Sequence, residues 1–94
     1  MSYDYFDASE RGYLAAGPSI GGQCRLRRYL ERHGKGSARI RFYCEEGYSE
    51  EPWQLARELE RLPVPRDPLL AELLRELAWA ARRADEIIIL SDGC

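Results

Sequence analysis

The longest periodic run of apolar residues in the chain lies between residues 68 and 84. Leucine and alanine recur there at steps of three and four, which places them on one side of a helix. Asp67 is a good N-cap, and Pro68 suits the first turn because its missing N–H would have no partner there. We therefore expect a helix at about 68–84. Its buried stripe would be Leu70, Leu73, Leu74, Leu77, Ala81 and Ala84.

Three isoleucines and a leucine follow this helix, at residues 87–90. β-Branched residues are poor helix formers and favour strands. A continuous apolar run is typical of a strand that is covered on both faces. We therefore expect residues 86–90 to form a central strand.

Two shorter helices are predicted, at about 22–33 and 51–62. Each carries apolar residues at helical spacing. Pro63 and Pro65 prevent the second of these helices from continuing, because proline lacks the N–H that a helix needs.

A further strand is expected at 38–44, where Ile40, Phe42 and Cys44 alternate with more polar residues. Residues 45–49 are interpreted as a turn. Two helices separate this strand from the one at 86–90, so the connection is long enough to join parallel strands. We expect the two strands to be parallel neighbours, joined by a right-handed crossover.

The first sixteen residues contain several aromatic side chains among small and acidic ones. Tyr3 and Tyr5 alternate with Asp4, which permits a short edge strand. An aromatic arm packed on the rest of the protein is the alternative interpretation of residues 1–16.

Ninety-four residues are enough for one modest core, so residues 1–94 are expected to form a single domain. The predicted fold is a small α/β or α+β sandwich with two to four strands and three helices.

The composition excludes general disorder and membrane-spanning segments, because 45% of the residues are hydrophobic and 32% are charged. The first ten residues lack the basic and apolar regions of a signal peptide, so we expect a cytoplasmic protein. Cys24, Cys44 and Cys94 are not closely paired and are expected to be reduced thiols. With a single histidine, His33, we expect no metal site, no cofactor and no enzymatic activity.

Charge is segregated along the chain. Residues 24–41 contain seven basic residues and only one acidic residue, Glu31, whereas the flanking segments are acidic. This basic segment could bind nucleic acid or a phosphate ligand, with help from the glycines before it. The alternative is an arginine face that is solvated or pairs with glutamates, within one chain or between subunits. The residues of the candidate anion site are Gly21, Gly22, Arg25, Arg28, Arg32, Arg39 and Arg41.

Trp79 is placed by helical geometry on the side of its helix opposite the leucine stripe. Its neighbours there are Arg75, Arg83 and Glu72. Either the aromatic segment near the N-terminus covers this tryptophan, or it contacts another molecule, since tryptophan and arginine are enriched in binding hot spots. Trp53, in the first turn of the preceding helix, leaves the same two choices open.

These patterns favour a small interaction protein that binds, and inhibits or regulates, another macromolecule. Proteins of this size in bacteria, phages and mobile elements include immunity proteins, antitoxins and antagonists of host defence. The expected partner is a protein, bound through Trp79, Arg75, Arg83 and Glu72, and a second copy of the chain is also a candidate. The alternative function is nucleic-acid or phosphate-ligand binding by residues 24–41. No membrane association is expected.

Overall fold

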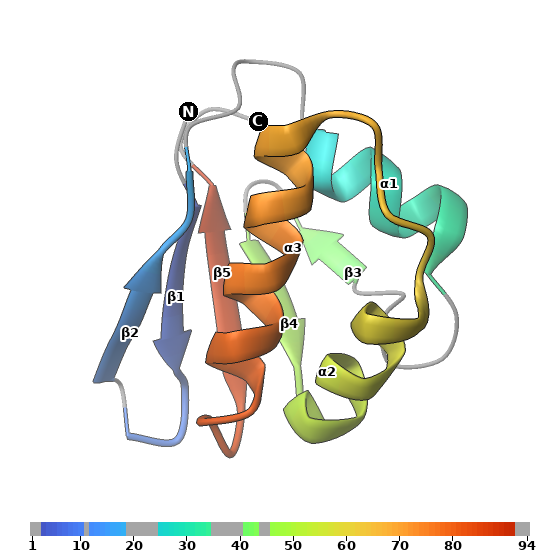
Figure 1. Cartoon of the computed structure of the whole chain (residues 1–94). Helices are drawn as coiled ribbons and strands as arrows, with labels where there is room; N and C mark the ends of the chain where they lie inside the picture. The colour runs from blue at the N-terminus through green and yellow to red at the C-terminus, as the bar shows by residue number, and fades with distance from the viewer. Residues whose placement is uncertain (1–2, 11, 19–24, 35–40, 44–45, 92–94) are drawn as a thin grey trace.

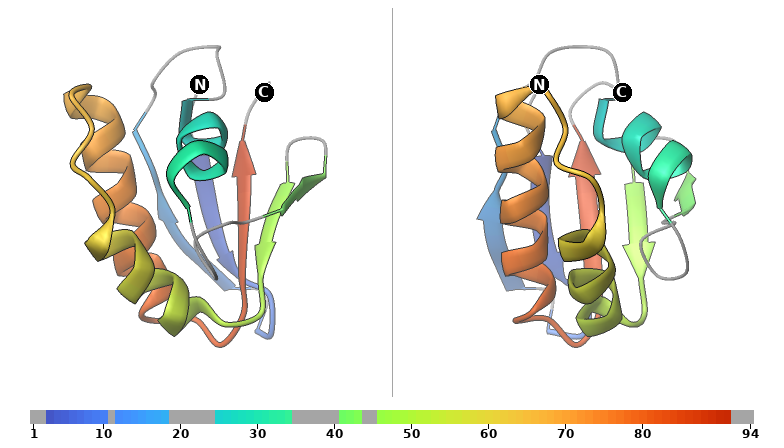
Figure 2. Two further views of the ribbon diagram at one scale, coloured as in Figure 1. Left: turned by 90° about the vertical axis from the view of Figure 1, so that its right-hand side faces the viewer. Right: turned by 45° about the vertical axis from the view of Figure 1, so that its right-hand side comes forward.

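In a computed structural model of the chain, the described residues form a small α+β domain of five strands and three helices (Figure 1). The structure describes all residues except 1–2, 11, 19–24, 35–40, 44–45 and 92–94. The elements, in order, are β1 (Tyr3–Asp7), β2 (Gly12–Ala16), α1 (Arg25–His33), β3 (Arg41–Tyr43), β4 (Glu46–Ser49), α2 (Pro52–Arg61), α3 (Pro68–Ala81) and β5 (Ile87–Ser91). The three helices lie on the same face of the sheet (Figures 1 and 2).

The strand order is β2-β1-β5-β4-β3, and every neighbouring pair is antiparallel. The prediction that the strands at 38–44 and 86–90 are parallel neighbours is therefore wrong. Residues 46–49, interpreted as a turn, form β4, which folds back on β3 and pairs with β5 in its place. The sheet consequently has one strand more than the largest number expected.

The N-terminal segment is neither an arm nor an edge strand at Tyr3 and Tyr5. Strand β1 lies inside the sheet, between β2 and β5, and both tyrosines are buried in the core. The edge position belongs to β2. The buried tyrosines supply ring surface to a core that would otherwise consist of aliphatic side chains.

The three predicted helices are confirmed, with small differences at their ends. Helix α2 stops at Arg61, just before the linker of residues 62–67 with its two prolines, and α3 stops at Ala81, earlier than expected. Helix α1 is described from Arg25, and residues 22–24 lie outside the described residues.

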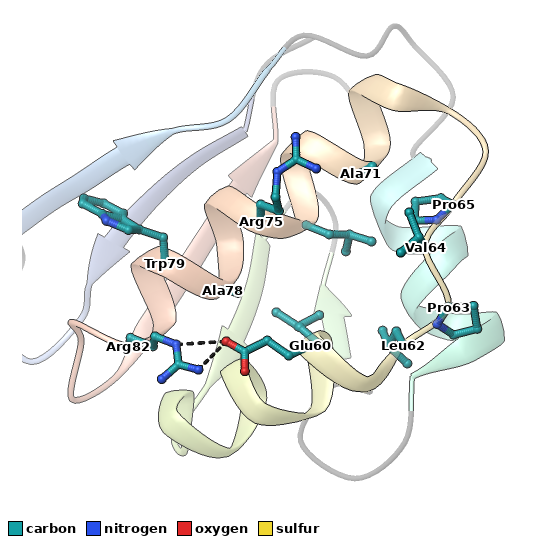
Figure 3. A pocket seen from close by; sticks show the side chains of 12 residues that line it. Glu60, Leu62, Pro63, Val64, Pro65, Ala71, Arg75, Ala78, Trp79 and Arg82 are labelled. Carbon is teal, nitrogen blue, oxygen red and sulfur yellow. Dashed lines mark hydrogen bonds and ion pairs between the residues drawn. The ribbon is translucent and has the colours of Figure 1, made fainter.

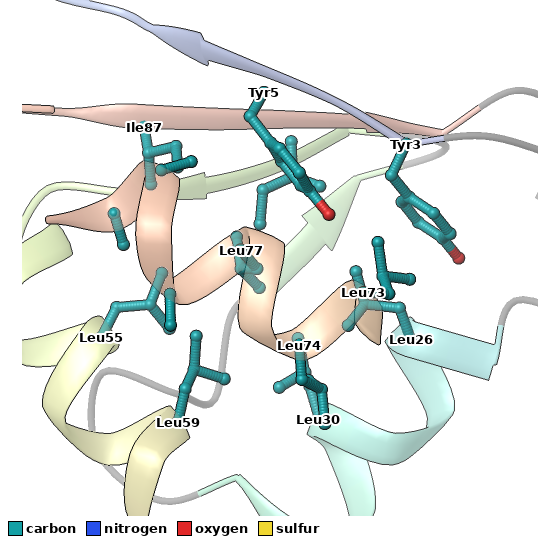
Figure 4. Close-up of a cluster of buried hydrophobic side chains, with 14 of the residues drawn as sticks. Tyr3, Tyr5, Leu26, Leu30, Leu55, Leu59, Leu73, Leu74, Leu77 and Ile87 are labelled. Atoms are coloured by element: carbon teal, nitrogen blue, oxygen red, sulfur yellow. The ribbon is translucent and has the colours of Figure 1, made fainter. Parts of the chain in front are cut away.

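The core lies between the sheet and the helix layer, as Figure 4 shows. The predicted stripe of α3 is buried from Leu70 to Ala81, and Ala84 is half-buried. Side chains from β1 and β5 meet this stripe from the sheet, and leucines from α1 and α2 meet it from the sides. The largest fully buried aliphatic side chains are Leu26, Leu30, Leu55, Leu73, Leu77, Ile87 and Ile89.

Strand β5 is central, but the described helices cover only one of its faces. Ile87 and Ile89 are fully buried beneath the helices, whereas Ile88 is half-buried and Leu90 is 38% exposed. The expectation of a strand covered on both faces is therefore wrong. All three helices pack on one side, which leaves the outward residues of β5 without a helix over them.

Gly17, directly after β2, lies between side chains of β1 and α3. It is buried, and its N–H donates a hydrogen bond to the carbonyl of Tyr3. A Cβ atom at this position would overlap the Leu73 side chain and the Tyr5 hydroxyl. Only glycine therefore fits between β1 and α3 at this point.

We expect Gly17→Ala to lower the free energy of unfolding by about 1–3 kcal/mol, because the added methyl group overpacks a closed core. Chemical denaturation of both proteins measures the difference. Gly12→Ala is the matched control, since nothing lies within 4 Å of a Cβ atom there. Equal stability of the Gly17→Ala variant and the wild type would contradict the tight packing around Gly17.

Asp67 joins two helices at their ends. Its carboxylate accepts hydrogen bonds from the N–H groups of Leu69 and Leu70, which caps α3, and it forms an ion pair with Arg25 of α1. Desolvation is the largest single influence on this carboxyl and would raise its pKa, but these hydrogen bonds and Arg25 together lower the pKa below its ordinary value.

Because the folded-state pKa of Asp67 is lowered, its charge stabilises the fold above the unfolded pKa of about 3.9 and ceases to do so as pH falls through the folded pKa. Asn keeps the cap but loses the charge. We expect Asp67→Asn to have a lower urea midpoint than the wild type at pH 7, with the gap closing below about pH 4. Asp67→Ala should have a lower urea midpoint than Asp67→Asn over the whole pH range. A difference in midpoint between the wild type and Asp67→Asn that does not change with pH would contradict the role of the Asp67 charge.

Candidate functional site

A groove of about 400 Å³ lies between the end of α2, the linker that follows it, and the outer side of α3. Figure 3 shows its walls, with Trp79 and Arg75 on α3 and Val64 on the linker. The lining residues are mostly apolar. They are Leu59, Glu60, Leu62, Pro63, Val64, Pro65, Ala71, Leu74, Arg75, Ala78, Trp79 and Arg82.

The floor and the rim of the groove differ in exposure. Leu59, Leu74 and Ala78 form a floor that is buried as part of the core. On the rim, Val64 is 84% exposed and Trp79 is 43% exposed. The groove therefore presents an apolar surface to solvent, with core residues as its floor.

The linker wall is restrained by its prolines and by a hydrogen bond. Proline fixes φ at positions 63 and 65, and Leu62 already has extended backbone angles. The Tyr29 hydroxyl, on α1, donates a hydrogen bond to the carbonyl of Pro63. Burial raises the pKa of Tyr29 above its ordinary value, which favours the protonated phenol that donates this bond. The wall is thus tied to a third helix that does not itself line the groove.

Arginines dominate the charged part of the rim. Arg82 is neutralised by Glu60, whose carboxylate accepts a hydrogen bond from its Nε at 3.0 Å. Arg83 lies over the Trp79 ring, with its guanidinium carbon 4.1 Å from the ring centroid, in a cation–π contact. Arg75 is exposed and makes no ion pair with any residue that the structure describes. The groove therefore carries positive charge that remains available to a ligand.

The structure brings together three of the four residues predicted from the helical pattern. Trp79 and Arg75 line the groove, and Arg83 stacks on the tryptophan. Glu72 is exposed on α3 but does not line the groove. Trp79 is not covered by an aromatic arm, since residues 3–7 form β1. Trp53 is 57% exposed, outside this groove, at the start of α2.

Sequence reasoning missed the linker and its contribution to the groove. Val64 stands between two prolines, where it can neither join a helix nor reach the core, and this was the available signal. The part played by Glu60 and Arg82 had no signal in the sequence, because their pairing depends on how α2 packs against α3.

The alternative anion site is only partly visible. Gly21, Gly22 and Arg39 lie outside the described residues, and Arg41 is described in its backbone alone. Arg25 is paired with Asp67, which leaves it less available to an anion. Arg28 and Arg32 are exposed on α1.

Within the described residues, no three histidine, cysteine or acidic side chains gather as metal ligands. The His33 ring packs against Tyr29, with the ring centroids 4.7 Å apart. Cys24, Cys44 and Cys94 lie outside the described residues. None of the helices described in this chain has the length and apolar character needed to cross a bilayer.

No protein-family model, curated protein or solved structure matches the chain. The geometry of the molecule itself is therefore the basis for the functional proposals.

We expect Tyr29→Phe to loosen the linker wall, because it removes the hydrogen bond to the Pro63 carbonyl. The free energy of unfolding should fall by about 0.5–1.5 kcal/mol. Hydrogen exchange at the Val64 and Arg66 amides should become faster while the centre of α3 is unaffected. Tyr13→Phe, at a tyrosine that is 58% exposed on β2, is the control and should change neither quantity. Unchanged exchange in the linker of the Tyr29→Phe variant would contradict the anchoring role.

Proposed function

We propose that this protein is a small interaction protein that binds another protein through the groove beside Trp79, and that binding inhibits or regulates its partner. The observation that carries the proposal is the exposed Trp79 on the wall of an apolar groove, with an arginine stacked on its ring. Tryptophan and arginine dominate the energetics of protein interfaces when they lie next to a pocket.

The fixed shape of the groove supports this function. Two prolines and the Tyr29 hydrogen bond hold one wall, and a helix packed on the core forms the other. A partner therefore does not have to order these walls when it binds, and less of its interaction energy is lost to conformational entropy. Pockets of this apolar kind are suited to one or two anchoring side chains.

The charges of the rim indicate the chemistry of the partner segment. Arg75 has no carboxylate partner among the described residues, and Arg83 is held close to the indole. A segment with an apolar side chain for the groove and a neighbouring carboxylate for Arg75 would complement both features.

Nucleic-acid or phosphate-ligand binding by residues 24–41 is the alternative proposal. The exposed Arg28 and Arg32 support it, and the pairing of Arg25 with Asp67 weighs against it. Binding of this kind should weaken steeply with added salt.

Affinity capture from the source cell tests the proposal, with nuclease treatment to remove nucleic acid. The wild type should retain a partner protein, and Trp79→Ala should retain at least about tenfold less of it, as expected for a hot-spot tryptophan. Trp53→Ala is the matched control, because it removes a tryptophan of similar exposure from the neighbouring helix. It should retain the partner fully.

Two outcomes would overturn the groove as the binding site. One is equal retention by Trp79→Ala and the wild type. The other is a partner that is lost on nuclease treatment and on Arg28→Glu, which would favour the alternative.

A further inference from the structure

The face of the sheet that points away from the helices carries a continuous row of large side chains. Strand register places Tyr13 of β2 beside Phe6 of β1, Phe6 beside Ile88 of β5, and Ile88 beside Tyr48 of β4. At about 4.8 Å per strand, this row runs for about 14 Å across the sheet. Leu90 adds apolar surface on β5, two residues beyond Ile88.

These side chains occupy positions that are usually polar. An antiparallel sheet with one open face normally alternates apolar residues inward with polar residues outward. Here Tyr13 is 58% exposed, Tyr48 39% and Leu90 38%, and Phe6 and Ile88 are half-buried. No described helix lies over them (Figure 2). Contiguous apolar side chains on an open face are a common mark of binding surfaces.

The rings in the row make specific contacts within the chain. Phe6 and Tyr13 meet edge to face, with centroids 5.4 Å apart and planes at 69°. The Tyr48 hydroxyl donates a hydrogen bond to the Glu86 carboxylate at 2.7 Å. Its polar atom is therefore satisfied within the chain, and the ring can be buried without leaving an unpaired phenol.

Carboxylates stand around this apolar row. Glu86 is bonded to Tyr48, and Glu50 lies close enough to act on the same phenol electrostatically. The hydrogen bond to Glu86, then desolvation, and then the negative charges of Glu86 and Glu50 raise the pKa of Tyr48 to about 12. Asp4 is opposite Leu90 in the neighbouring strand, on the outward side of β1. Along β1, β4 and β5 the row thus has an acidic border, whereas at the β3 edge the residue opposite Tyr48 is Arg41.

The carboxylates of the border favour some possible binding partners of this face over others. Nucleic acid could stack on the aromatic rings, but its phosphates would be repelled by Glu50 and Glu86. A second copy meeting face to face would place both sets of carboxylates in one interface, because a two-fold interface uses the same patch on both subunits. A segment that combines apolar and basic side chains meets neither obstacle.

We propose that the open face of the sheet, centred on Ile88, binds a partner segment that is apolar along one side and carries lysine or arginine along its edges, as in a basic amphipathic helix. The apolar side covers the row from Tyr13 to Tyr48, and the basic residues pair with Asp4, Glu50 and Glu86. This surface lies on the opposite side of the molecule from the groove, so the proposal does not rest on the function assigned to the groove.

Two peptide probes test the proposal in NMR titrations of the full-length protein. Both have about 18 residues, long enough to form a helix, and the same leucine positions. One carries lysine and the other glutamate at the polar positions. The lysine peptide should shift the backbone amides of β1, β4 and β5, and the glutamate peptide should leave them unchanged.

Variants of the protein assign the binding to this face. Glu50→Gln and Glu86→Gln should each weaken the lysine peptide by about two- to fivefold, as expected for exposed ion pairs. Ile88→Thr keeps a β-branched residue in the strand and should weaken binding of the lysine peptide by about tenfold or more. Tyr13→Ser provides the same test at the sheet edge, with little effect on folding. Trp79→Ala should bind the peptide as the wild type does.

Several results would overturn the proposal. They are equal binding of the glutamate peptide, shifts that fall on α2 and α3 in place of the strands, and no shifts at about 1 mM peptide. Sedimentation that shows self-association of the wild type, abolished by Ile88→Thr, would identify a second copy as the occupant instead.

Loss of protein capture by Trp79→Ala with unchanged peptide binding separates this surface from the groove.

Discussion

Helix α3 buries one leucine stripe against partners on three sides, and the rest of the structure depends on that burial. The stripe meets β1 and β5 beneath it and the leucines of α1 and α2 beside it. Every helix is therefore drawn to the same side of the sheet. Both candidate surfaces follow from this arrangement. The groove forms where α2 and its linker meet α3, and the open sheet face remains because no described helix lies on it.

Much of the helix layer could be predicted from the sequence, because helical periodicity and caps are local signals. The stripe from Leu70 to Ala81 and the cap at Asp67 are both present in the structure. The exposure of Trp79 also followed from the helical wheel, since one core cannot bury both sides of the same helix. The groove could not be predicted, because Val64 and Trp79 become neighbours only when the linker packs along α3.

The sheet was harder to predict, because pairing depends on contacts between distant residues. Strand β4 is four residues long and includes Gly47, so it gives almost no alternating pattern. Without β4, the long connection from residue 44 to residue 86 favoured a parallel crossover. The isoleucine run was also ambiguous. It is typical of a strand covered on both faces, yet Ile88 belongs to an aromatic row on a face with no described helix over it.

The pairing of β1 with β5 has a consequence for how the chain folds as it is synthesised. Asp7 and Ile87, eighty residues apart, are partners in the middle of the sheet. Long-range pairing of this kind slows folding, because a large loop must close before its contacts form. Helix α3 leaves the ribosome before β5, so its leucine stripe has only part of the sheet to pack on during that interval. During that interval the leucines of the stripe are exposed to contacts that can lead to aggregation.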